Sequence, residues 1–192
     1  AKSGDATNYQ LVLNLEKEVV SVGGETPLLT RQTYQYFQNR PQFYGTEGNY
    51  FAQTGYGSSV LGTNSWGQEG NCTWYAYGRL KELGFNPDDI LLPPGNRNAG
   101  QWGGVLKNGA RILGANETPQ IGDVAQYTGS PGHVAIVEKV ENGRVYLSES
   151  HWSTDRDGID SDGDGKFAGD GTFHRIVNYS IGNPSRYIRL AK

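Results

Sequence analysis

The sequence of 192 residues contains one cysteine and no methionine. A single cysteine cannot form an internal disulfide, so the stability of the fold depends on packing and on any metal that it binds. No apolar run approaches the ~18 residues that a membrane-spanning helix needs, which excludes a membrane span. The chain starts at Ala1 without a charged and then apolar signal segment. We therefore expect the mature or trimmed form of a secreted protein that is extracellular or located in the cell wall.

The chain also lacks a large excess of charge of either sign. Lysine and arginine number 17 against 20 aspartate and glutamate residues, which gives a net charge of −3 at pH 7 and a pI of about 5.6. This balance provides no general attraction for nucleic acid or for an anionic membrane. Hydrophobic residues make up only 35% of the chain, whereas glycine occurs 28 times. This composition is typical of a loop-rich secreted domain, and the length allows one domain with a smaller extension.

Residues 1–64 are interpreted as an aromatic- and glycine-rich amino-terminal extension that packs on the main domain. Apolar residues alternate from 9 to 15 as in a strand, but the charged residues 16–18 also suit a helix, so both assignments stay open. Residues 27–37 favour a short helix. Residues 40–67 favour an irregular segment that is either a covering arm or part of a substrate groove, and we favour the arm.

The cysteine lies in a stretch from Gly70 to Gly84 that has the pattern of a helix. Asn71 can act as the N-cap, apolar side chains recur at helical spacing, and Gly84 can end the helix. Cys72 therefore falls in the first turn. The backbone N–H groups of that turn and the positive end of the helix dipole favour a thiolate and can stabilise an oxyanion. Position alone thus supplies two ingredients of acyl transfer.

After a loop at residues 87–104, the chain changes to short β runs from Gly122 onward. An Asn-Gly pair at 142–143 favours a type I′ hairpin, because this pair readily takes the positive φ that the turn requires. We therefore expect an antiparallel sheet. The predicted strands are residues 124–127, 133–140, 144–150, 173–179 and 187–190.

A base for Cys72 is predicted at His133, which begins one of these strands. A histidine at the start of a strand can face the N-terminus of a helix that packs on the sheet. The hairpin brings the next strand back alongside, so Glu149 and His151 end near His133 on one face. One of them can accept a hydrogen bond from the second imidazole nitrogen and hold the tautomer. His174, in a later strand, is interpreted as structural.

These motifs together resemble the CHAP family, the cysteine- and histidine-dependent amidohydrolases and peptidases of bacterial cell-wall lysis. The resemblance covers residues 66–152 in the order and spacing of the family. One departure stands two residues after Glu149, where His151 replaces an asparagine that relatives often have. The matching segments are Gly-Asn-Cys-Thr-Trp-Tyr at 70–75, Asn-Ala-Gly-Gln-Trp at 98–102, Pro-Gln-Ile-Gly-Asp-Val-Ala at 119–125, Gly-His-Val-Ala-Ile-Val-Glu at 132–138 and Ser-Glu-Ser at 148–150.

The resemblance implies an α+β, papain-like fold in which the helix bearing the cysteine packs on an antiparallel β-sheet. We assign residues 65–192 to the catalytic domain. The resemblance implies Cys72 as nucleophile, His133 as base and Glu149 as orienter, and we add His151 as a further catalytic candidate. The implied reaction is hydrolysis of a peptidoglycan amide through a thioester, without a cofactor for the chemistry. The bond is either the N-acetylmuramoyl-L-alanine amide or a peptide bond of the stem or cross-bridge.

Two other classes of function remain open at this point. The chain also fits a non-catalytic, calcium-dependent module that binds the cell wall through the aromatic residues of 43–66. It fits a cysteine protease that acts on protein as well. In each case we expect a monomer, and the expected partner of the hydrolase is peptidoglycan.

An acidic stretch at residues 155–171 begins like an EF-hand loop. Its pattern Asp-x-Asp-x-Asp-Gly places Asp160, Asp162 and Asp164 at the first, third and fifth positions. The twelfth position is a glycine preceded by Asp170, and strands flank the stretch, which disfavours an EF-hand domain. A structural Ca²⁺ held by these four aspartates is favoured over a solvated acidic turn, because the carboxylates would repel one another without a cation.

Overall fold

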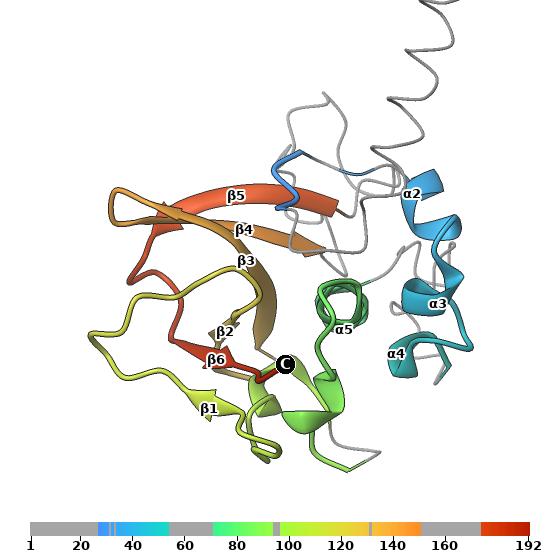
Figure 1. Cartoon of the computed structure of the whole chain (residues 1–192), viewed down its shortest axis with the longest axis horizontal. Coiled ribbons are helices and arrows are strands. Elements are labelled where there is room, and N and C mark those ends of the chain that lie inside the picture. Colours follow the sequence, from blue (N-terminus) through green and yellow to red (C-terminus); the bar gives the residue numbers. More distant parts are fainter. Residues whose placement is uncertain are drawn as a thin grey trace, which may run out of the picture.

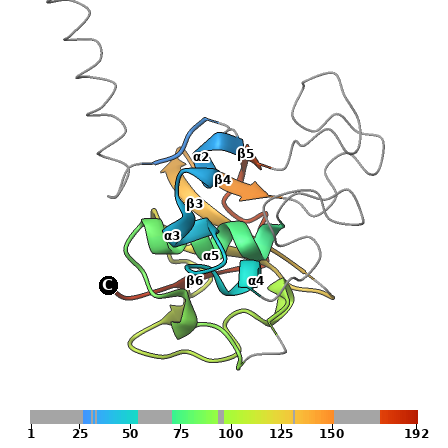
Figure 2. The same ribbon diagram turned by 90° about the vertical axis from the view of Figure 1, so that its right-hand side faces the viewer.

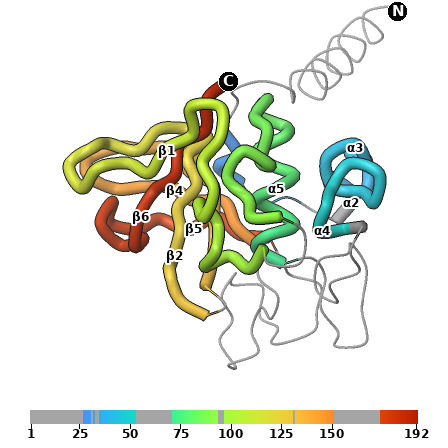
Figure 3. Tube along the Cα trace, turned by 90° about the horizontal axis from the view of Figure 1, so that it is seen from below, coloured from blue at the N-terminus to red at the C-terminus, as the bar shows by residue number. Residues whose placement is uncertain are grey.

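A computed structural model of the chain describes residues 27–30, 32, 34–53, 71–93, 97–130, 132–150 and 174–192. Three layers are visible: a curved sheet, helix α5 and a group of short helices on the far side of α5 (Figures 1 and 3). The helical elements are α2 (Tyr34–Gln38), α3 (Pro41–Tyr44), α4 (Tyr50–Gln53), α5 (Cys72–Glu82) and the 3₁₀ turns η1 (Pro87–Asp89) and η2 (Ala99–Gln101). These helices are all too short or too polar to span a lipid bilayer.

Among the described residues the sheet has six strands in the order β1-β6-β2-β3-β4-β5, and every neighbouring pair is antiparallel. The predicted antiparallel sheet is therefore confirmed. Because α5 packs on this sheet, the predicted α+β, papain-like fold class is confirmed as well. The hairpin turn has φ of 52° at Asn142 and 71° at Gly143, as the type I′ pattern requires. The strands are β1 (Arg111–Ile112), β2 (Val124–Tyr127), β3 (His133–Glu141), β4 (Arg144–Ser150), β5 (His174–Ser180) and β6 (Arg186–Arg189).

Helix α5 begins and ends where the capping residues predict. The Asn71 side chain accepts a hydrogen bond of 3.1 Å from the Trp74 N–H, and Gly84 follows the helix with φ of +85°. Figure 2 shows α5 running across the sheet with α3 and α4 over it. Because both sides of the helix are covered, it is buried over nearly its whole length. Its weak amphipathic pattern follows from that position.

The main core lies between α5 and one face of the sheet. Val134 and Ile136 of β3 belong to it, whereas Ala135 and Val137 belong to a smaller cluster on the opposite face. This alternation is the period of two expected for a strand covered on both faces. The largest fully buried aromatic side chains of the main core are Trp74, Trp102, Tyr44, Tyr75 and Phe37.

The segment before α5 contributes to the same core. Phe37, Tyr44 and Phe51 are buried in one cluster with α5, and the indole N–H of Trp74 donates to the Tyr44 carbonyl at 2.9 Å. The prediction of an irregular chain after residue 40 was wrong in part, because α3 and α4 each form one helical turn. Turns this short are stabilised by burial of their aromatic side chains, which a propensity pattern does not reveal.

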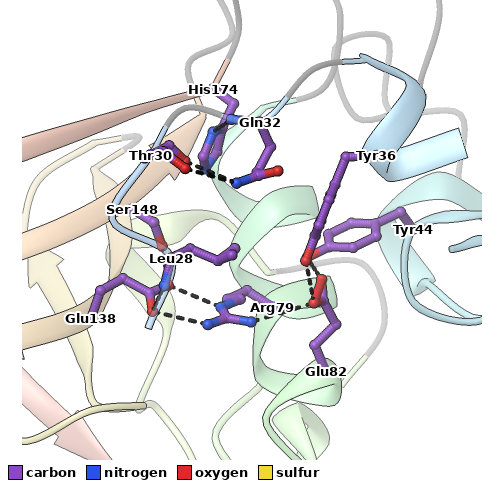
Figure 4. Close-up of polar contacts among 10 residues, drawn as sticks. All are labelled: Leu28, Thr30, Gln32, Tyr36, Tyr44, Arg79, Glu82, Glu138, Ser148 and His174. Carbon is purple, nitrogen blue, oxygen red and sulfur yellow. Dashed lines mark hydrogen bonds and ion pairs between the residues drawn. The ribbon is translucent and has the colours of Figure 1, made fainter. Parts of the chain in front are cut away.

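A buried ion pair joins this segment, α5 and the sheet (Figure 4). The Arg79 guanidinium donates two hydrogen bonds of 2.9 Å to Glu138, which sits where the register of β3 shifts against β4. Glu138 also accepts from the Ser148 hydroxyl at 2.6 Å and the Leu28 backbone N–H at 2.9 Å. All three donors approach a carboxylate that water does not reach, so its desolvation is offset by hydrogen bonds.

A second buried carboxylate, that of Glu82, lies on α5 one turn after Arg79. Glu82 accepts hydrogen bonds from the hydroxyls of Tyr36, at 2.6 Å, and Tyr44. It also lies 3.3 Å from Arg79. Glu138 and Glu82 thus share Arg79 as a partner. Through Leu28, Tyr36 and Tyr44 they also bind the segment before α5 to the helix and the sheet.

Candidate active site

Cys72 is the first residue of α5 and is buried. The first intrahelical hydrogen bond is donated by the Tyr75 N–H to the Asn71 carbonyl. The N–H groups of Cys72 and Thr73 precede that bond and lie at the positive end of the helix dipole. They are therefore placed to stabilise negative charge that develops next to the cysteine sulfur.

His133 is the first residue of β3, as the sequence predicts. The strand begins there because Gly132 takes φ of +79° and passes close to η2. A β-carbon on Gly132 would lie 2.6 Å from the Gly100 nitrogen and 2.8 Å from the Tyr127 carbonyl oxygen. Only glycine fits this close approach of the two backbones, which places the imidazole at the beginning of β3.

The imidazole of His133 lies between Cys72 and Glu149. Its Nε2 is 2.5 Å from Oε2 of Glu149, which leaves Nδ1 for its hydrogen bond with the Cys72 thiol. Burial lowers the pKa of His133. Hydrogen bonds with Cys72 and Glu149, followed by the charges of these two groups, have the larger opposite effect and raise this pKa to about 10. The structure thus favours an imidazolium at neutral pH, held between a sulfur and a carboxylate.

Two further side chains surround this group. The Tyr127 ring lies 5.6 Å from the His133 ring, on the strand that pairs with β3. The Arg175 Nε donates to Oε1 of Glu149 at 2.6 Å, from the strand that pairs with β4. The Glu149 side chain is only 2% exposed. A buried carboxylate therefore receives one cation on each of its oxygens.

Cys72, His133 and Glu149 are predicted from the sequence to share one site, and the structure brings these three side chains together. Arg175 and Tyr127 were not predicted. The position of Tyr127 beside His133 could have been deduced from the pairing of two predicted strands. The position of Arg175 depends on the register of β5, which a long acidic segment separates from β4 in the sequence. No local pattern in the sequence indicates that register.

The remaining predicted site residues lie outside the described part of the chain. These are His151 and the four candidate calcium ligands Asp160, Asp162, Asp164 and Asp170. Within the described residues, no group of three or more histidine, cysteine, aspartate or glutamate side chains is arranged to hold a metal ion. Calcium binding and the role of His151 therefore stay predictions, as does the monomeric state.

His174 lies at the other face of β5. It is buried, accepts a hydrogen bond of 2.9 Å from the Gln32 backbone N–H on Nδ1, and packs against the rings of Phe37 and Tyr75. These contacts agree with the interpretation of His174 as a structural residue.

The sequence around these residues matches a known protein family. The CHAP-domain model matches residues 62–151, which contain Cys72, His133 and Glu149. This part of the chain is similar to the CHAP domain. The match confirms the resemblance drawn from the motifs. The boundary that we predict at residue 64 stays a prediction, because the family match covers neither the preceding segment nor β5 and β6.

Similar curated proteins come from staphylococci. Over 102 residues, 51% of this chain, the sequence is 31% identical to a protein of Staphylococcus aureus named "Probable autolysin LDP", of which it covers 33%. Over 91 residues it is 32% identical to "N-acetylmuramoyl-L-alanine amidase sle1" of Staphylococcus epidermidis, of which it covers 25%. The chain thus spans a third or less of these relatives, and no solved structure matches it significantly.

Proposed function

We propose that this protein is a peptidoglycan hydrolase that cleaves an amide bond with Cys72 as nucleophile, His133 as general base and acid, and Glu149 as the residue that orients the imidazole. The observation that carries the proposal is the hydrogen-bonded series of Cys72, His133 and Glu149 at the N-terminus of α5, inside the part of the chain that is similar to the CHAP domain. We propose that the protein acts outside the cell, in the cell wall.

The first half of the reaction forms a thioester. The Cys72 proton resides on Nδ1 of His133, and the sulfur attacks the carbonyl carbon of the amide. Electrons move onto the carbonyl oxygen, and this oxyanion lies near the first-turn N–H groups of α5. The intermediate collapses with cleavage of the C–N bond, while Nδ1 gives its proton to the leaving amine.

The second half restores the enzyme. Water attacks the thioester carbonyl as His133 takes its proton, the C–S bond breaks, and the sulfur leaves as the thiolate beside the imidazolium. Glu149 accepts a hydrogen bond from Nε2 throughout, which keeps Nδ1 directed at the reacting atoms and stabilises the imidazolium. Besides the substrate and water, the groups named in these steps are side chains and backbone groups of this chain.

The names of the relatives support the substrate class. One is named an autolysin and another an N-acetylmuramoyl-L-alanine amidase. We therefore propose the bond between N-acetylmuramic acid and L-alanine as the first candidate. A peptide bond of the stem or cross-bridge presents the same amide to the same thiolate, so the two candidates differ only in the groups that are released.

The test is a digest of purified peptidoglycan analysed by mass spectrometry. Cleavage by an amidase releases stem peptides that begin with a free L-alanine amine, whereas an endopeptidase leaves the stem attached and exposes a different amine. The Cys72→Ala variant is the matched control, and it should release neither product. Release of the same products by Cys72→Ala, or processing of protein substrates in place of peptidoglycan, would contradict the proposal.

A further inference from the structure

Arg175 is the side chain of β5 that reaches the proposed active site. Its backbone pairs with that of Glu149 across β4 and β5, and its Nε lies 2.6 Å from Oε1 of that carboxylate. The other oxygen, Oε2, lies 2.5 Å from Nε2 of His133. The two oxygens of Glu149 are thus divided between a guanidinium and an imidazole. Arg175 also lies beyond the residues that match the CHAP-domain family.

A carboxylate in this position needs a second partner to keep its orientation. Rotation about the last bond of a glutamate side chain meets only a broad, shallow energy profile. A single hydrogen bond to His133 would therefore leave the carboxylate plane poorly defined. A short, charge-assisted bond to the second oxygen fixes that plane, and arginine forms such bonds with a rigid, planar group.

The sheet determines where Arg175 can act. Because Arg175 and Glu149 are directly paired residues on antiparallel strands, their side chains lie on the same face at the closest cross-strand distance. Val177 and Tyr179 follow on that face of β5 and pack against the smaller apolar cluster. The guanidinium therefore approaches Glu149 from a backbone that the sheet holds in register.

We propose that Arg175 is a positioning residue, which holds Glu149 by Oε1 so that Oε2 stays directed at His133 and the imidazole stays directed at Cys72. This inference rests on the proposed function, since it assigns a role within the same site. In this proposal Arg175 acts through its bond to Glu149.

Arg175→Met tests the proposal, with Arg175→Lys as the charge-retaining variant. Arg144→Met is the matched control, because Arg144 also bridges β4 and β5 but does so at the exposed end of the strands, through Asn178. Cys72 is the only cysteine in the sequence, so its alkylation by iodoacetamide reports the thiolate without any substrate. The second readout is kcat and KM on soluble peptidoglycan fragments.

We expect Arg175→Met to slow alkylation at pH 7 and to lower kcat, each by about tenfold, which is typical for loss of a group that orients a functional side chain. KM should stay unchanged, because no substrate contact is lost. Arg175→Lys should fall between Arg175→Met and the parent protein, and Arg144→Met should equal the parent protein. A purely structural role would lower the melting temperature and leave the alkylation rate of the folded protein unchanged.

Parent-like alkylation and kcat in a folded Arg175→Met protein would overturn the proposal. If Arg175→Met does not fold, Arg175→Lys decides the question, and a parent-like alkylation rate in that variant overturns the proposal too. The alkylation assay needs no peptidoglycan. Failure of the parent protein to cleave peptidoglycan would therefore overturn the proposed function. The alkylation rates would still test the role of Arg175 in activating Cys72.

Discussion

At the scale of single residues, the site depends on charges that are buried beside one another. The His133 side chain is 19% exposed and that of Glu149 only 2%. Isolated charges at such positions are costly, so the imidazolium and the carboxylate each require a partner. Cys72, Glu149 and Arg175 supply those partners in an alternating order of sign once the thiolate forms. The arrangement keeps each charge next to an opposite one.

The raised pKa of His133 predicts an unusual alkaline limit of activity. An unperturbed histidine has a pKa near 6.5, whereas the surroundings of His133 raise its pKa to about 10. Since the imidazolium is the acid that protonates the leaving amine, kcat/KM should fall only as the pH rises toward 10. Glu149→Gln removes a charge that raises this pKa, so its alkaline limb should move to lower pH. Coincident alkaline limbs in the two proteins would contradict this assignment.

Gly132 is the residue on which the position of His133 depends most directly. Gly132→Ala would force a β-carbon to within 2.6 Å of a backbone nitrogen at a φ of +79°. We expect kcat to fall by about 100-fold, because displacing a functional side chain by about 1 Å has that effect.

Gly143→Ala is the control for this substitution. Gly143 also has a positive φ, of +71°, but its β-carbon would meet nothing within 4 Å. Both variants should lose about 1–3 kcal/mol of stability through backbone strain. Equal kcat values in the two variants would show that the close approach at Gly132 does not position His133.

At the scale of elements, α5 serves two purposes at once. Its N-terminus presents Cys72, and its length is enclosed between the sheet and α2–α4. A glycine in the middle of this helix is unfavourable by about 1 kcal/mol relative to alanine. Gly78 is nevertheless found there, because the ring of Tyr44 occupies the place of a side chain.

Gly78→Ala should therefore destabilise the protein despite its better helix propensity. The new β-carbon would lie 2.3 Å from the Tyr44 ring and 2.9 Å from the Phe43 carbonyl. Overpacking costs about 1–3 kcal/mol against a gain in propensity of about 1 kcal/mol, so we expect a net loss of up to about 2 kcal/mol in denaturant unfolding. In the double variant with Tyr44→Leu, the effect of Gly78→Ala should shrink, since room becomes free. An increase in stability of Gly78→Ala alone would contradict the packing argument.

At the scale of the whole molecule, the folded unit is larger than the CHAP-domain match. Strand β6 lies between β1 and β2, and β5 carries Arg175, yet both follow residue 151, where the match ends. Residues before the match also matter, because the Leu28 N–H binds Glu138 and Phe37 lies in the main core. Segments on both sides of the match therefore complete one core.

Calcium binding is the prediction that concerns this larger unit. The acidic segment connects β4 to β5, whose ends carry Glu149 and Arg175. If Ca²⁺ binds there at a concentration of about 100 times its Kd, it stabilises the fold by about 2.7 kcal/mol, or roughly 5–10 °C in melting temperature. EDTA should lower the melting temperature of the protein and leave that of an Asp160→Asn/Asp162→Asn/Asp164→Asn variant unchanged. An equal response of both proteins to EDTA would contradict a calcium site at these residues.

Much of the fold and part of the site could be predicted from local patterns. The cap at Asn71, the stop at Gly84 and the turn at residues 142–143 are each set by the conformational preferences of a few neighbouring residues. The hairpin between β3 and β4 fixed their relative register. The hairpin accounts for Glu149 lying beside His133, whereas the pairing of His133 with Cys72 was implied by the resemblance to the CHAP family.

The contacts that local patterns did not reveal join residues far apart in the chain. Arg79 and Glu138 are 59 residues apart, and Glu149 and Arg175 are 26 apart across a segment with no pairing signal. Such pairs form only when strand order and register bring their backbones together, and many side chains contribute to that register at once. The chemistry at Cys72 could therefore be read from neighbouring residues, whereas the arginine that holds its orienting carboxylate depends on how the complete sheet assembles.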